Sequence, residues 1–90
     1  MINPENELDL ILLSGSDRQT AMKLIYSQYI RYLTAVCSRY IVDDEDVKDV
    51  LQESFLKIFA SLGRFQYRGE GSLKAWMSKI TINETLKFIS

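Results

Sequence analysis

The sequence predicts an all-α protein, a compact bundle of about four helices that forms one domain. Four separate segments carry apolar residues at three- and four-residue steps, the spacing of a buried face on an amphipathic helix. Almost no stretch alternates polar and apolar residues as a half-buried strand does. The segments follow one another with short connections, which is typical of a helical bundle.

The first helix is expected at about residues 4–14. Pro4 suits the first turn of a helix, and Glu5 and Glu7 suit the positive end of the helix dipole. Gly15 is expected to end the helix. The expected apolar stripe consists of Leu8, Ile11 and Leu12.

The second helix is expected at about residues 17–41, with Asp17 as its capping residue. Its apolar stripe consists of Met22, Ile25, Tyr26, Tyr29, Leu33, Val36, Cys37 and Tyr40. Because Cys37 is the single cysteine and lies within this stripe, we interpret it as a buried structural thiol.

The third helix is expected at about residues 44–62, opened by the acidic residues at 43 and 44 and ended by Gly63. Its stripe consists of Val47, Val50, Leu51, Phe55, Ile58, Phe59 and Leu62. A loop without periodicity follows at 63–71. Ser72 is then expected to cap a fourth helix at 72–89, with the core residues Leu73, Trp76, Met77 and Ile80.

Composition excludes several classes of protein. A chain of 90 residues with 47% apolar content has enough material for one small core. One cysteine and no histidine argue against a disulfide framework, against a common zinc site and against the usual general base. No apolar run approaches a membrane span, and the first residues lack the order of a signal peptide. We therefore expect a cytoplasmic protein that is not an enzyme and has no cofactor.

The acidic cluster Asp43-Asp44-Glu45-Asp46 suggests a calcium loop, but its spacing does not fit one. Such a loop needs glycine at its sixth position and glutamate at its twelfth. Counted from Asp43, these positions hold Lys48 and Ser54. Capping and the helix dipole explain the cluster, so no metal site is predicted.

Charge is distributed unevenly along the chain, although the net charge is only −1. Residues 1–56 contain five basic and ten acidic side chains, and residues 57–90 contain six basic and two acidic ones. Such asymmetry is typical of a protein that meets a polyanion on one surface and a basic partner on another. The alternative is an ordinary solvated surface whose charge is uneven by chance.

A polar face on the third helix is the first candidate site. Asp49, Gln52, Glu53 and Leu56 share one side of the helix, turned away from the apolar stripe. Two carboxylates and an amide in one row can accept several hydrogen bonds from arginines of a partner helix. A solvated face without a partner is the alternative.

The loop and the last helix form the second candidate site. Gly69 and Gly71 permit unusual backbone angles, and Phe65 and Tyr67 offer flat faces for an unstacked base. Alternatively, Phe65 enters the core and Tyr67 only covers the end of the bundle. Arg68 and Lys74 are placed to meet phosphates, as is Lys79, and Asn83 can pair with a base edge.

In their order, these motifs resemble the promoter-melting and polymerase-docking domain, sigma region 2, of an extracytoplasmic-function (ECF) sigma factor. The resemblance covers about residues 18–83. It implies that the stretch Asp49–Phe55 docks on the clamp helices of the RNA polymerase β′ subunit, with Asp49, Gln52 and Glu53 as contact residues. It also implies that the loop forms a pocket, with Tyr67 as a pocket residue, for a base flipped out of the non-template strand of the minus-ten promoter element.

The run from Trp76 to Asn83 looks like the family's promoter-reading helix, with Lys79 where arginine is usual. After Asn83 the likeness weakens, because Lys87 and Ser90 stand where relatives often carry an acid and an arginine. The family's second domain, which reads the minus-thirty-five element, is expected to be missing from this chain. The resemblance leaves open whether an anti-sigma factor acts on the protein. The alternative function is a helical interaction module whose acidic face binds a partner without DNA.

Overall fold

The computed structural model describes residues 2–90, which form four α-helices and one short 3-10 turn. The elements are α1 (Glu7–Ser16), α2 (Arg18–Ser38), α3 (Asp44–Ser61), η1 (Leu62–Arg64) and α4 (Ser72–Ile89). No strand occurs within residues 2–90, so the predicted all-α bundle of four helices is confirmed. In the same range, no helix combines the length and the apolar character that a membrane crossing requires.

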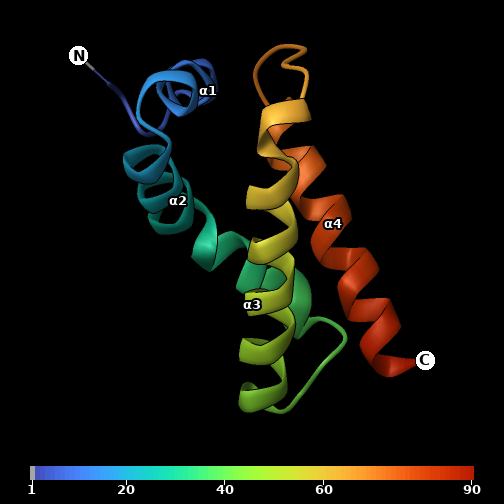
Figure 1. Cartoon of the computed structure of the whole chain (residues 1–90). Helices are drawn as coiled ribbons and strands as arrows, with labels where there is room; N and C mark the ends of the chain where they lie inside the picture. Colours follow the sequence, from blue (N-terminus) through green and yellow to red (C-terminus); the bar gives the residue numbers. More distant parts are fainter. Residues whose placement is uncertain (1) are drawn as a thin grey trace.

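The three long helices form the body of the molecule. Figure 1 shows α3 and α4 running side by side in opposite directions, joined at the top of the picture by the loop of residues 65–71. α2 packs against both of them, and α1 folds back along α2. The loop therefore lies at one end of the bundle, and the connection between α2 and α3 lies at the other end.

Two aspartates start the helices that the sequence predicted. The Asp17 carboxylate accepts a hydrogen bond from the backbone N–H of Thr20 at 3.2 Å, which caps α2. Asp43 caps α3 by accepting from the N–H groups of Glu45 at 2.8 Å and Asp46 at 3.2 Å. Within residues 2–90, no group of three or more histidine, cysteine, aspartate or glutamate side chains is arranged to hold a metal ion.

Helix α1 differs from its prediction at both ends. It begins at Glu7 and not near Pro4, because the Asn6 side chain is the cap and accepts from the N–H of Asp9 at 3.1 Å. Gly15 does not end the helix, which continues to Ser16. Asp17 is then both the last cap of α1 and the first cap of α2, so the two helices are joined by a single residue.

The predicted end of α2, at about residue 41, was also wrong, whereas that of α3, at about residue 62, agrees within one residue. α2 stops at Ser38, because the N–H groups of Tyr40 and Ile41 both donate to the carbonyl of Cys37 and close a turn there. α3 stops at Ser61, and Gly63 lies inside the 3-10 turn that follows.

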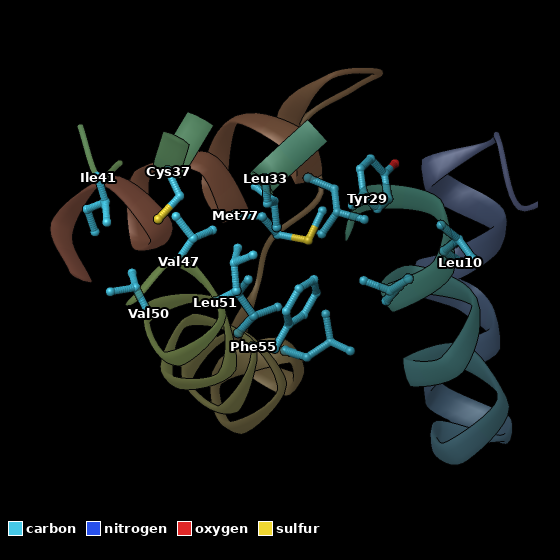
Figure 2. Packing of buried hydrophobic residues seen from close by; sticks show 14 residues of the cluster. Leu10, Tyr29, Leu33, Cys37, Ile41, Val47, Val50, Leu51, Phe55 and Met77 are labelled. Carbon is cyan, nitrogen blue, oxygen red and sulfur yellow. The ribbon is translucent and has the colours of Figure 1, made fainter. Parts of the chain in front are cut away.

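The core is built mainly from α2, α3 and α4. Figure 2 shows Leu33 of α2 and Met77 of α4 meeting Leu51 and Phe55 of α3. Cys37 is fully buried beside Thr85, as the sequence predicted for a structural thiol. The buried hydrophobic cluster comprises Leu10, Ile25, Tyr29, Leu33, Cys37, Ile41, Val47, Val50, Leu51, Phe55, Ile58, Leu62, Leu73 and Met77.

The predicted apolar stripe of α1 was correct for Ile11, which packs against the core, and wrong for its other two residues. Leu8 and Leu12 are exposed, and the buried side chains of the helix are Glu7 and Leu10. Residues 7 and 10 are separated by almost one turn, so they face the same way, and that face meets α2 and the start of α4. A carboxylate at Glu7 thus occupies a place in the packed face of α1 that hydrophobic pattern alone would not assign to it.

We predict opposite effects for alanine at two glycines. Gly71 has a φ of +94°, whereas Gly15 is helical, and a Cβ added there would meet no heavy atom within 4 Å. Gly71→Ala should lower the free energy of unfolding by about 1–2 kcal/mol, because a side chain disfavours left-handed backbone. Gly15→Ala should raise it by about 0.5–1 kcal/mol. Urea denaturation followed by circular dichroism measures both, and an unchanged Gly71→Ala stability would contradict the left-handed backbone.

Candidate functional site

The polar face of α3 points away from the core. Asp49, Gln52 and Glu53 are exposed, and the side chain of Leu56 is 58% exposed. Val50, Leu51, Phe55 and Ile58 on the other side of the same helix are buried. The row of Asp49, Gln52, Glu53 and Leu56 is named the α3 face below. It is an uninterrupted strip of two acids, an amide and an apolar side chain.

Hollows flank the α3 face on both sides. Towards α2, Gln52 and Leu56 border a groove of about 830 Å³ whose lining includes the aromatic rings of Tyr26, Phe55 and Phe59. Towards α4, Asp49 and Glu53 border a smaller hollow of about 260 Å³. The α3 face is therefore a ridge, and a partner could reach it from either side.

The carboxylates of the α3 face form no ion pairs within residues 2–90. The neighbouring lysine, Lys57, binds Glu84 of α4 instead, with 2.7 Å between Nζ and Oε2. Lys87 approaches the same carboxylate at 3.4 Å. Since Lys57 is held by Glu84, Asp49 and Glu53 keep their hydrogen-bonding capacity for a partner.

The Lys57–Glu84 pair joins α3 to α4 and shifts the pKa of both side chains. The hydrogen bond from Lys57 lowers the pKa of Glu84 below its ordinary value of 4.5. The same bond raises the pKa of Lys57 above 10.5, and the nearby charge of Glu53 adds to this. The pair therefore stabilises the folded state across the neutral pH range.

Both glycines of the loop adopt left-handed backbone, with φ of +108° at Gly69 and +94° at Gly71. This confirms the unusual angles expected of them. Ser72, however, does not cap α4. Its hydroxyl accepts the N–H of Arg68 at 3.1 Å, which closes the loop, and the cap position is held by Gly71, which has no side chain to offer.

The start of α4 is capped from another helix by Glu7 of α1. Oε1 of Glu7 accepts the N–H groups of Gly71 at 3.0 Å and Leu73 at 2.9 Å. Oε2 accepts the N–H of Lys74 at 3.0 Å. The Glu7 side chain is almost fully buried, at 2% exposure, so these bonds are shielded from water. The carboxylate satisfies N–H groups that a helix start leaves without intrahelical partners.

Tyr67 is half-buried and lies in an acidic environment. Partial burial raises its pKa, and the carboxylates of Glu70 and Glu7 raise it further. Burial and the same two carboxylates raise the pKa of Tyr29 in α2 to about 12. The negative charges of Glu70 and Glu7 therefore act on the Tyr67 hydroxyl.

A basic and aromatic hollow adjoins the loop. Phe65 and Trp76 pack with 4.9 Å between ring centroids. Together with Arg64, Gln66, Arg68 and Ser72 they line a hollow of about 350 Å³. Phe65 and Trp76 are half-buried against the core. This agrees with the alternative that Phe65 enters the core and with the prediction of Trp76 as a core residue. Their remaining surface forms the floor of this loop hollow.

The structure divides the predicted DNA-binding residues of α4 between two sides. Lys79 and Asn83 are exposed one turn apart, on the same face as Ser72. Lys74 precedes Asn83 by about two and a half turns, which places it on the opposite side. There its ammonium lies 4.1 Å from the centroid of the Tyr32 ring of α2, in a cation–π contact. Lys74 therefore does not share a surface with Lys79 and Asn83.

The four residues of the α3 face share one exposed side of the helix, as their spacing predicted. Sequence reasoning missed three residues near the loop. Arg64 joins Arg68 in the loop hollow, and a four-residue spacing around two aromatics was a signal for it. Tyr32 holds Lys74. Glu7 caps α4, and nothing in its own segment indicates a partner more than sixty residues away.

Fold and site together define a helical binding module, with an acidic ridge on one helix and a basic, aromatic loop end beside another. Residues 25–90 match the family model described as Sigma-70 region 2. The chain belongs to this family, which confirms the predicted resemblance. The matched residues include the whole of α3, the loop and α4.

Three relatives illustrate the similarity. The chain is 28% identical over 83 residues to the RNA polymerase sigma-H factor of Pseudomonas aeruginosa, covering 92% of this chain and 42% of that protein. It is 33% identical over 70 residues to the ECF RNA polymerase sigma-E factor of Haemophilus influenzae, covering 78% and 35%. For the sigma-E factor of Salmonella typhimurium the identity is 34% over 71 residues, covering 79% and 36%. The chain thus spans less than half the length of each relative.

We predict that Glu84→Gln lowers the stability of the domain at neutral pH and flattens its response to acid. A carboxylate with a lowered pKa stabilises the fold above its ordinary value of 4.5, and that stabilisation is lost as pH falls through the lower folded value. Melting temperatures between neutral pH and pH about 3 measure this. Glu45→Gln is the matched control, because Glu45 pairs with Lys48 only at the surface, at 3.6 Å. Equal acid responses of the Glu84→Gln variant and the parent would contradict the assigned role.

Proposed function

We propose that this chain is the part of an ECF-type sigma factor that docks on core RNA polymerase and recognises and melts the minus-ten promoter element during transcription initiation. Membership of the sigma-70 region 2 family supports a role in initiation. The observation that carries the proposal is the combination of an exposed acidic ridge on α3 with a basic, aromatic loop end beside α4. The proposal includes no enzymatic activity and no cofactor.

The α3 face is proposed to bind the clamp helices of the β′ subunit. Its two carboxylates form no ion pairs within residues 2–90, and carboxylates accept paired hydrogen bonds from arginine. Leu56 adds an exposed apolar side chain at the edge of the groove towards α2. An interface with an apolar centre and charged surroundings is the usual anatomy of a specific protein contact.

The loop and the outer face of α4 are proposed to bind the non-template single strand. Lys79 would meet phosphate, and Asn83 would pair with a base edge. Arg68 lines the loop hollow, and Tyr67, which does not line it, is the candidate stacking face. Lys74 is proposed only as a long-range contributor of positive charge, because its ammonium lies over Tyr32.

Binding energy would drive the promoter melting proposed for this domain. Docking holds the domain at the promoter, and capture of unstacked bases offsets the few kcal/mol that unpairing costs. Stacking on an aromatic ring is worth about 1–3 kcal/mol per base, so one or two captured bases are of the right magnitude. In the whole protein, a further domain reading the minus-thirty-five element and regulation by an anti-sigma factor would extend this role.

We predict that Glu53→Arg weakens binding to core RNA polymerase by at least about tenfold, because like charges placed together at an interface cost several kcal/mol. The double variant Asp49→Ala/Gln52→Ala should weaken it as well. Glu5→Arg is the matched control, an exposed acid that precedes α1 and lies outside α3. Pull-down or fluorescence titration with core polymerase measures binding, with circular dichroism to verify the helices. Full affinity in folded Glu53→Arg would rule out the α3 face.

We predict distinct effects for three substitutions at the DNA end. Tyr67→Ala should reduce open-complex formation without changing polymerase docking, because it removes a stacking face. Lys79→Ala should lower the affinity for all promoter sequences about equally, since phosphate contacts carry no sequence information. Asn83→Ala should relax preference at one promoter position by about 1–3 kcal/mol.

These effects are measured by transcription from a panel of minus-ten variants with the full-length protein. Lys23→Ala serves as a control, because this exposed lysine lies on α2, outside the loop, α4 and the α3 face. If Tyr67→Ala transcribes like the parent and Asn83→Ala keeps the promoter ranking, the nucleic-acid half of the proposal fails. The domain would then be better described as a protein-interaction module that uses its acidic face alone.

A further inference from the structure

We propose that Glu7 is a positioning residue for the nucleic-acid loop, so that α1 forms part of the promoter-binding site although it never touches DNA. The inference rests on the proposed function of the loop. Its basis is the buried carboxylate of Glu7, which holds the N–H groups of Gly71, Leu73 and Lys74 at 2.9–3.0 Å. These three residues span the junction between the loop and α4.

The contact of Glu7 attaches the end of the loop to the rest of the bundle. Most other hydrogen bonds of residues 65–71 are local: Phe65 donates to Leu62, Arg68 to Ser72, and Ser72 to Gly69. Such bonds shape the loop but do not attach it to the rest of the bundle. Glu7 supplies the attachment to a different helix, at the glycine whose left-handed backbone turns the chain into α4.

The Glu7 carboxylate also prevents the N-terminus of α4 from binding phosphate. The N-terminus of a helix commonly binds phosphate, because its free N–H groups and its dipole favour an anion. Here the anion is supplied by the protein itself and is buried at 2% exposure. A DNA phosphate is thus excluded from the start of α4, and the strand is directed to the exposed residues around it.

Glu7 lies outside the residues that match the sigma-70 region 2 model, which begin at residue 25. Helix α1 is nevertheless joined to α2 through the single residue Asp17, so its position on the bundle is well defined. A segment outside the matched region therefore sets the geometry of the loop inside it. Tyr67 and Arg68, four and three residues before Gly71, are the side chains whose placement depends on this contact.

The sign of a change in DNA affinity distinguishes positioning from simple electrostatics. Glu7→Gln keeps an oxygen for the two bonds made by Oε1 but loses the acceptor for Lys74, and Glu7→Ala loses all three. If Glu7 acts only as a nearby negative charge, both variants should bind single-stranded DNA more tightly than the parent. If it positions the loop, affinity should fall in the order parent, Glu7→Gln, Glu7→Ala, with a total loss of about three- to tenfold.

The experiment uses the 90-residue chain and a short, mixed-sequence, fluorescein-labelled single-stranded DNA at low salt. Glu70→Gln is the matched control, because Glu70 is an exposed acid in the same loop. This variant should bind the single-stranded DNA about twofold more tightly than the parent, since it lacks one negative charge. Amide hydrogen exchange at Gly71, Leu73 and Lys74 gives a second measurement and should accelerate in both Glu7 variants. Circular dichroism selects a temperature at which each variant is folded, and Glu7→Gln alone carries the test if Glu7→Ala does not fold.

Weaker binding by Glu7→Gln together with tighter binding by Glu70→Gln would establish the positioning role. Unchanged or tighter binding by Glu7→Gln, while the parent still binds and Tyr67→Ala still weakens binding, would overturn it and leave the proposed function intact. If the parent shows no binding that Tyr67→Ala or Lys79→Ala reduces, the proposed DNA role itself fails. Amide exchange at residues 71–74 that does not change in Glu7→Gln would overturn the positioning role without any reference to DNA.

Discussion

The first turn of α4 has backbone N–H groups that its own sequence does not satisfy, and the arrangement of one end of the molecule follows from this. Gly71 stands at the cap position without a side chain, and the Ser72 hydroxyl is used to close the loop. The carboxylate of Glu7 makes up the deficit from α1. A buried N–H without a partner costs about 1–3 kcal/mol, so three of them amount to a large part of a small domain's stability.

Helix α3 shows how a short chain serves both a core and a surface. One side contributes Val50, Leu51, Phe55 and Ile58 to the core, and the other presents the α3 face. The pair between Lys57 and Glu84 lies where these two sides meet and ties α3 to α4. Because Lys57 is engaged there, it does not neutralise Glu53 one turn earlier. The stabilising ion pair and the acidic ridge are therefore compatible on one helix.

Most of the fold could be predicted from sequence because its signals are local. Asp17 and Asp43 cap helices through residues two or three positions away, and the stripes of α2 and α3 follow the helical period. The predictions failed where a residue distant in the sequence determines the capping or the burial. Ser72 has good capping chemistry, but Glu7 reaches the same N–H groups from α1. Likewise Leu8 and Leu12 looked apolar enough for a core, yet α1 turns Glu7 and Leu10 inwards.

The candidate site divides in the same way between local and distant causes. The α3 face follows from helical spacing alone, and so does the separation of Lys74 from Asn83, which nine residues on a helix already imply. No local pattern placed Arg64 and Trp76 around one hollow, or the charge of Glu7 near Tyr67, because each pair comes from separate segments. The sequence was therefore a good guide to which residues carry charge and aromatic surface. It was a poor guide to which of these residues lie close together.

Basic and acidic groups both lie around the loop, and this limits how a nucleic acid could approach. Arg64 and Arg68 border the loop hollow, with Lys79 and Asn83 further along the outer face of α4. Glu7 and Glu70 lie near Tyr67, where they raise the pKa of its hydroxyl. On the proposed function, a strand would follow the arginines and α4 with its phosphates and could turn only an uncharged base towards Tyr67. The acidic surroundings of that tyrosine then act against phosphate and leave the flat ring available for stacking.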